Sequence, residues 1–275
     1  MSDLHGSDAY SPVEIARRVE AVGEAKARMA ALPLALLGVL AGAFIGLGAM
    51  LFVLVKSDPT LGFAASALLG GLVFSFGLFM VVVAGAELFT GNNLIVMAWA
   101  DGRVSSAQVL RNWAIVCLAN FLGAAGLALL VYASGHASLN GGAIGQKVVQ
   151  IAVAKQEMPF VTAFLRGVLC NVLVCMAVWM AMGGRSVTDK AVAVVFPIMA
   201  FVAAGFEHSI ANMYLMPLAM LLQHGGLTGD AAVTWSGMLG NWLPVMLGNV
   251  LGGAVLVAGV YHVIYKRKPC SSPPA

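Results

Sequence analysis

Residues 84–93 read AGAELFTGNN, and residues 204–213 read AGFEHSIANM. The two segments share Ala, Gly, Glu and Asn at four positions when 84–93 is laid on 204–213. Each interrupts an apolar run, 62–100 or 191–222, that is longer than the roughly 20 residues a straight membrane helix needs. We therefore predict two helices that break in the middle of a membrane.

A wider repeat surrounds these interruptions. When 112–132 is laid on 241–261, 11 of the 21 positions are identical. The chain thus divides into one repeat over about 30–133 and a second over about 160–265, each with three spans. An odd number of spans reverses the second copy, which gives an inverted repeat. We expect an all-α membrane protein with six transmembrane helices, of which the second and fifth are broken, over the apolar runs 31–55, 62–100, 110–133, 160–182, 191–222 and 241–265.

The composition excludes an ordinary soluble domain. Of the 275 residues, 60% are apolar and 10% are charged, whereas about a quarter of residues in soluble domains are charged. We expect a cytoplasmic segment over 1–29, a channel domain over 30–268 and a short tail over 269–275. The net charge of +3 provides no basic patch for nucleic acid, and the four cysteines show no zinc-site spacing.

The positions of lysine and arginine set the predicted orientation. With the N-terminus inside, 11 of the 15 basic residues fall on the cytoplasmic side. Basic residues are enriched in cytoplasmic loops, so we expect both termini in the cytoplasm.

Three ionisable residues, Glu87, Glu207 and His208, lie deep in apolar sequence, where such groups are expensive and usually functional. The glutamates have a simpler explanation as structural braces that accept hydrogen bonds from backbone N–H groups freed at the breaks. His208 is different because Leu88 occupies the matching place in the first repeat. Symmetry does not require an imidazole there, which favours a function.

Other polar residues near the breaks allow two interpretations. Thr90 and Ser209 are placed to cap half-helices, and Asn92 and Asn212 to satisfy orphaned backbone groups. Thr90 is also placed to donate to an anion beside His208. Asn171 is either a polar link between helices or part of a pore lining.

The basic and the apolar residues around the breaks also allow two interpretations each. Lys155 and Arg166 on the outer side, and Lys26 on the inner side, either extend their charges to the membrane interface or attract anions into a vestibule. A set of large apolar side chains is either plain core or a set of gates in a pore: Phe74, Leu78, Leu88, Val174 and Phe201.

Three stretches, 84–92, 170–179 and 205–213, resemble the formate/nitrite transporter family, and the resemblance extends over about 12–267. Residues 184–191 are most similar to its formate branch. The resemblance implies a pentamer in a bacterial inner membrane, with an aquaporin-like pore in each protomer. It implies that His208 is the central pore residue, with Thr90 on a mobile loop and Asn171 along the path. It also implies a periplasmic constriction formed by Phe74, Leu78 and Phe201, and a cytoplasmic slit formed by Leu88 and Val174. Lys26 and Lys155 are implied to be the basic residues of the two vestibules.

These observations lead to one mechanistic hypothesis. The vestibules concentrate formate, nitrite or acetate-like anions, His208 relays a proton with Glu207 beside it, and the neutral acid passes the apolar gates. A nitrite or hydrosulfide channel of the same family is the alternative. An intramembrane enzyme built on His208 with Glu207 or Glu87 is disfavoured, because the sequence lacks a His-Glu-x-x-His motif and has one deep histidine. We expect no metal and no cofactor.

Overall fold

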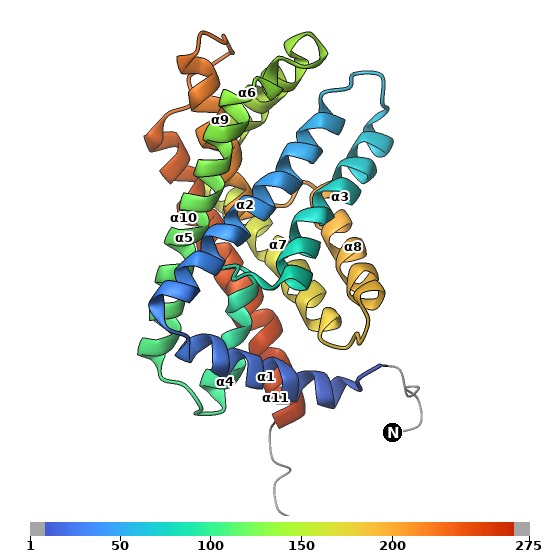
Figure 1. Ribbon diagram of the computed structural model, residues 1–275, viewed down its shortest axis with the longest axis vertical. Helices are drawn as coiled ribbons and strands as arrows, with labels where there is room; N and C mark the ends of the chain where they lie inside the picture. The colour runs from blue at the N-terminus through green and yellow to red at the C-terminus, as the bar shows by residue number, and fades with distance from the viewer. Residues whose placement is uncertain (1–8, 267–275) are drawn as a thin grey trace, which may run out of the picture.

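The computed structural model describes residues 9–266, and the regular structure in this part of the chain is all helical, without strands (Figure 1). Parts of the predicted 1–29 and 30–268 segments, and the whole 269–275 tail, lie outside the described residues. The elements in chain order are α1 Pro12–Arg28, α2 Ala31–Lys56, α3 Phe63–Met80, π-helix Val81–Gly85, 3-10 helix Gly91–Ile95, α4 Val96–Ala100, α5 Ser106–Ala133, short 3-10 turns His136–Ser138 and Asn140–Gly142, α6 Ala143–Gln156, α7 Phe160–Ala181, α8 Val187–Ala203, α9 Ser209–His224, α10 Trp235–Val250, π-helix Leu251–Gly259 and α11 Val260–Lys266.

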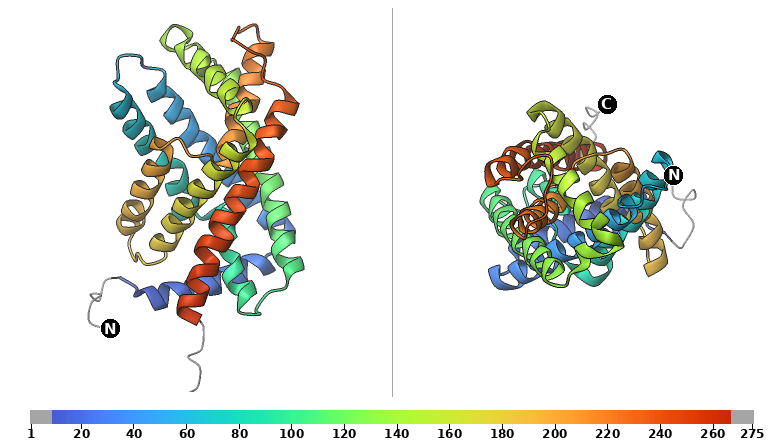
Figure 2. Two further views of the ribbon diagram at one scale, coloured as in Figure 1. Left: turned by 180° about the vertical axis from the view of Figure 1, so that it is seen from behind. Right: turned by 90° about the horizontal axis from the view of Figure 1, so that it is seen from above.

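Five helical stretches in the described part are long and apolar enough to cross a membrane. They are Ala31–Lys56, Phe63–Gly85, Ser106–Ala133, Phe160–Ala181 and Trp235–Tyr265. The last is α10, its π-helical continuation and α11, which form one rod along the bundle (Figure 2). The predicted fifth span is divided into α8 and α9, of 17 and 16 residues, neither of which is long enough alone.

Both predicted breaks are present. At the first break, the preceding helix ends in a π-turn at Gly85, whose φ is 81°. At the second break, α8 ends just before Gly205, whose φ is 70°. These left-handed conformations suit glycine, which lacks a Cβ. The chain then runs without regular structure over 86–88 and 206–208 before it becomes helical or turn-like again. The four residues shared by the two interruptions therefore mark the same local geometry in each repeat.

Two helices that the sequence analysis did not predict complete the repeats. Helix α1 begins with a capping box, in which the Ser11 hydroxyl accepts from the Glu14 N–H and the Glu14 carboxylate accepts from the Ser11 N–H. Helix α6 buries one face through Ile144, Val148 and Val149. The two helices lie at opposite ends of the bundle, as an inverted repeat requires (Figure 1). Because α1 and α6 are of mixed polar composition, neither contains the long apolar run that predicts a membrane span.

Glycines let paired helices approach closely. A Cβ on Gly123 of α5 would overlap the carbonyl oxygen of Val39 on α2, and a Cβ on Gly252 would overlap that of Val168 on α7. The register that lays 112–132 on 241–261 also lays the first pair on the second. The close contacts therefore lie within one chain, and they repeat.

Candidate functional site

At the first break, the Glu87 carboxylate lies among side chains from three elements. Lys26 Nζ lies 3.0 Å from Glu87 Oε1, and Asn92 Nδ2 donates to Glu87 Oε2 at 2.7 Å. Asn92 Nδ2 also donates to Asn112 Oδ1, and the Asn112 amide donates to the Lys26 carbonyl. This closed ring of contacts ties α1 and α5 to the break.

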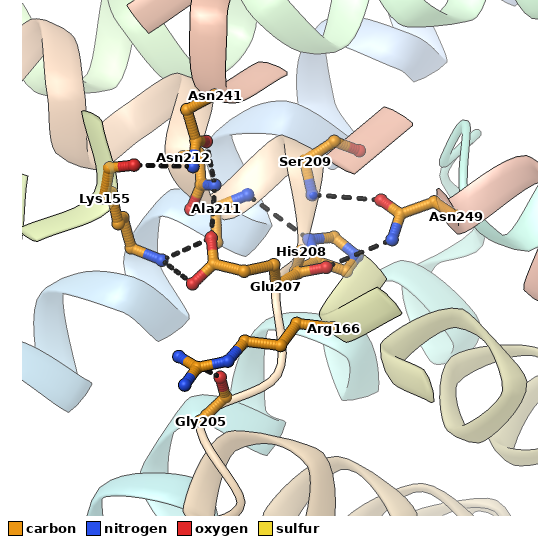
Figure 3. A network of polar contacts seen from close by, with 10 residues as sticks. All are labelled: Lys155, Arg166, Gly205, Glu207, His208, Ser209, Ala211, Asn212, Asn241 and Asn249. Carbon is orange, nitrogen blue, oxygen red and sulfur yellow. Dashed lines mark hydrogen bonds and ion pairs between the residues drawn. The ribbon is translucent and has the colours of Figure 1, made fainter. Parts of the chain in front are cut away.

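The second break holds the same ring (Figure 3). Lys155 Nζ lies 2.7 Å from Glu207 Oε1, and Asn212 Nδ2 donates to Glu207 Oε2 at 2.8 Å. Asn212 also donates to Asn241 Oδ1, and Asn241 Nδ2 donates to the Lys155 carbonyl. Lys155 is the counterpart of Lys26 in the register that lays 112–132 on 241–261. The repeat therefore extends to α1 and α6, and each copy has a fourth helix.

Asparagine side chains, rather than the glutamates, satisfy much of the exposed backbone at the breaks. Asn249 Nδ2 donates to the Glu207 carbonyl, and its Oδ1 accepts from the Ser209 N–H (Figure 3). Asn249 Nδ2 also donates to the Gly167 carbonyl. Asn120 makes the equivalent three bonds at the first break. The expectation that the two glutamate carboxylates accept freed backbone N–H groups is therefore wrong: they accept from lysine and asparagine side chains.

The two lysines that we expected in the vestibules thus pair with the two glutamates that we expected to brace the breaks. The pairs are Lys26–Glu87 and Lys155–Glu207. The side chains of Lys155 and Glu207 are 14% and 5% exposed. A nearly buried carboxylate is stable there because an ammonium and an amide compensate its lost hydration. The matching places of Lys26 and Lys155 in the two repeats were the sequence signal for this pairing, but the match concerns a single residue.

His208 caps the helix that follows the second break. Its Nδ1 accepts from the Ala211 N–H at 3.2 Å, and its Nε2 lies 3.0 Å from Thr90 Oγ1. Ser209 does not cap α9, contrary to expectation, because it is already the first helical residue. Since Nδ1 is occupied as an acceptor, we assign the proton of the neutral ring to Nε2, which then donates to Thr90.

Thr90 is held in place through its backbone. Its carbonyl accepts from the amides of Asn93 and Asn171, each at 3.2 Å, and from the Cys175 thiol at 3.4 Å. Asn171 also donates to the Asn249 carbonyl at 2.6 Å. Asn171 therefore links the two breaks behind the Thr90–His208 pair and lines neither of the cavities beside it.

Two cavities flank this pair. The α1-side cavity, of about 350 Å³, is lined by residues that include Leu78, Leu88 and Gly91. The α6-side cavity, of about 110 Å³, is lined by residues that include Phe74, Phe201 and His208. Because Gly91 neighbours Thr90, the Thr90–His208 contact links the walls of the two cavities.

The predicted gates divide between these cavities. The rings of Phe74 and Phe201 meet edge to face at 5.7 Å, and Phe201 stacks on His208 at 5.9 Å. Leu78, which was grouped with these rings, lines the opposite cavity with Leu88 because it lies one helical turn beyond Phe74. Val174 is 1% exposed and lies in the core without lining either cavity.

No cluster of three or more metal-ligating side chains occurs within residues 9–266. Inverted repeats with paired helix breaks, facing cavities and polar groups between them define a class: multi-pass membrane transport proteins.

The comparisons with known proteins identify the family. The formate/nitrite transporter family matches residues 13–263. The chain is 37% identical to the formate channel FocA of Escherichia coli (strain K12), over 95% of this chain and 96% of that one. It is 38% identical to the uncharacterized transporter YrhG of Bacillus subtilis (strain 168), over 94% of each. The chain belongs to the formate/nitrite transporter family, whose members are transport proteins and not enzymes.

The fold agrees with solved structures of this family. One, described as a pentameric formate channel with formate bound, is 35% identical and superposes with a TM-score of 0.80, over 86% of this chain and 97% of that one. Another, an FNT family ion channel, is 33% identical with a TM-score of 0.81, over 93% and 99%.

Proposed function

We propose that the chain carries formate and similar small monovalent anions through a pore in each protomer, and that His208 and Thr90 relay the proton that makes them neutral. The observation that carries the proposal is the 3.0 Å contact between Thr90 Oγ1 and His208 Nε2, between a cavity on each side. The likeness to formate channels supports formate as the substrate.

Magnitudes favour a neutral permeant. A carboxylic acid with a pKa near 4 is protonated in about one molecule per thousand at pH 7, which corresponds to roughly 4 kcal/mol. Moving a bare anion past apolar rings such as Phe74 and Phe201 costs far more, up to tens of kcal/mol. Protonation inside the pore is therefore the less expensive route.

The hydrogen bonds around His208 order the proton steps. A neutral ring that gives up its Nε2 proton would become an anion, so Nδ1 must first take a proton from solvent. That step releases the Ala211 N–H, which now donates to Nδ1. The Nε2 proton then passes to Thr90 Oγ1 as the Thr90 hydroxyl proton passes to the carboxylate, and the acid leaves uncharged. The ring is left neutral with its proton on Nδ1, and it returns to the starting tautomer by losing that proton to solvent and taking one up at Nε2.

The assembly and orientation are part of the proposal. A pentamer is supported by the pentameric solved relative, and exposed leucines such as Leu118 and Leu122 offer apolar surface for a neighbouring protomer or lipid. Helices α1 and α11 lie at the same end of the bundle (Figure 1), and the distribution of basic residues favours the cytoplasmic side of a bacterial inner membrane for that end. Native mass spectrometry in detergent tests the pentamer.

His208→Asn tests the relay and retains the cap. Asparagine is a good N-cap residue, so the variant is expected to fold, yet its amide does not titrate. Proteoliposomes with wild-type protein should take up formate faster as the outside is acidified, and His208→Asn should lose this acid dependence. Equal pH profiles would exclude the relay.

Nitrite and hydrosulfide are the alternative substrates, because weak acids of similar size meet the same barrier. Uptake of formate, nitrite, acetate and hydrosulfide, measured side by side in the same proteoliposomes, distinguishes these substrates.

A further inference from the structure

Within residues 9–266, three charged residues line the α1-side cavity: Lys26, Glu87 and Lys190. Lys26 Nζ lies 3.0 Å from Glu87 Oε1 and donates to Asn92 Oδ1 at 2.9 Å. This ion pair is neutral as a unit, and its ammonium is already coordinated. Lys26 is therefore poorly suited to attract an anion into the cavity.

Lys190, on the first turn of α8, has no such compensation. No carboxylate within residues 9–266 lies within ion-pair distance of its ammonium. The carboxylate of neighbouring Asp189 is turned to the backbone, where it accepts from the N–H groups of Arg185 and Ser186. The side chain of Lys190 is half-buried and lines the cavity.

The two cavities consequently differ in charge. The α6-side cavity is lined by the Lys155–Glu207 pair and by no other lysine, arginine or acidic residue of the described chain. The place of Lys190 in the first repeat is taken by Gly70, in the register that lays 84–93 on 204–213. The repeat does not require a lysine at this position, just as it does not require the imidazole of His208.

We propose that Lys190 is the residue that draws small monovalent anions into the α1-side cavity, so that the channel has an electrostatic preference for anions arriving from that side. This inference rests on the proposed transport function. A single uncompensated charge beside an apolar cavity raises the local concentration of the opposite ion, and salt screens the effect. Permeation of the acid past the gates does not depend on Lys190.

Uptake of radiolabelled formate by inverted and right-side-out membrane vesicles tests the proposal. In the vesicles whose outer surface carries the α1 end, Lys190→Gln should raise the apparent KM about threefold to fivefold at low ionic strength. The difference should shrink toward zero in high salt. Vesicles of the other orientation should show no change, and Lys190→Arg should behave as wild type.

Arg185→Gln is the matched control. Arg185 is an exposed cation on the same loop, but it packs over the Tyr10 ring at 4.6 Å and does not line the cavity. The Arg185→Gln substitution should leave the apparent KM for formate unchanged. An unchanged KM for Lys190→Gln, or an equal rise for Arg185→Gln, contradicts the role of Lys190 while wild-type formate uptake still supports the channel. Absence of wild-type uptake contradicts the transport function itself, and the inference with it.

Discussion

The Oγ1 atom of Thr90 lies 3.0 Å from the Nε2 atom of His208, although the two residues are 118 positions apart. The contact joins the two helix breaks at positions that the repeat does not relate, since Leu88 is the counterpart of His208 and Ile210 that of Thr90. The two helix breaks are therefore related by the repeat, whereas the Thr90–His208 pair, to which we assign the proposed proton relay, is not.

Thr90→Val should slow formate uptake at least tenfold, because valine keeps the shape of threonine but has no hydroxyl to pass a proton. Thr90→Ser retains the hydroxyl and should keep most of the activity. Initial rates in proteoliposomes at pH 6 and pH 7 give the comparison. Wild-type rates for the valine variant would show that the hydroxyl takes no part.

The Lys155–Glu207 pair predicts a pattern in stability. Lys155→Met should destabilise the protein by about 3 kcal/mol, because it leaves a nearly buried carboxylate without its cation. The double variant Lys155→Met/Glu207→Gln should recover much of this loss, since the glutamine has no charge to compensate. Unfolding in mixed detergent micelles gives the free energy of unfolding of the wild type, Lys155→Met and the double variant. A double variant that is less stable than Lys155→Met would contradict the argument.

Much of this arrangement was predictable from residue patterns. The two breaks and the inverted repeat follow from the matches of 84–93 with 204–213 and of 112–132 with 241–261. His208 was predictable as a functional candidate because the first of these matches pairs it with a leucine, and because it is an ionisable residue deep in an apolar run. These features are local or periodic, and a sequence displays both directly.

The contacts between segments were not predictable in the same way. Lys26 and Lys155 lie in mixed polar helices, where a single matching residue is too weak a signal to predict a contact. Their pairing with Glu87 and Glu207 is therefore seen only in the structure, which places α1 and α6. The side on which Leu78 lies, and the cap at His208 instead of Ser209, depend on where each half-helix ends to within one residue or one turn.

The start of α1 should depend on pH. The backbone N–H of Ser11 and then its hydroxyl donate to the Glu14 carboxylate and hold the pKa of Glu14 below its usual 4.5. Because the folded state favours the ionised form, the cap stabilises α1 fully above the unfolded pKa and is lost as the pH falls through the folded value.

Hydrogen exchange of the α1 amides checks this prediction. Protection at the first turn should decrease below about pH 4 relative to neutral pH, after correction for intrinsic rates. Glu14→Gln can make the same capping bonds without titrating and should show no such decrease. An identical acid response in both proteins would assign the effect to another group.

The packing of α2 against α5 predicts opposite effects of two neighbouring glycine substitutions. A Cβ on Gly123 would overlap the Val39 carbonyl, which is backbone and has little freedom to move, whereas a Cβ on Gly126 meets nothing within 4 Å. Gly123→Ala should therefore destabilise the protein by about 3 kcal/mol or lower its yield of folded protein. Gly126→Ala, one turn further along α5, should keep the wild-type Tm in detergent or raise it slightly, because alanine favours helix. Gly252→Ala should resemble Gly123→Ala, since its Cβ would overlap the Val168 carbonyl in the second repeat. If Gly123→Ala and Gly126→Ala melt together, α2 and α5 do not approach as closely as the structure has them.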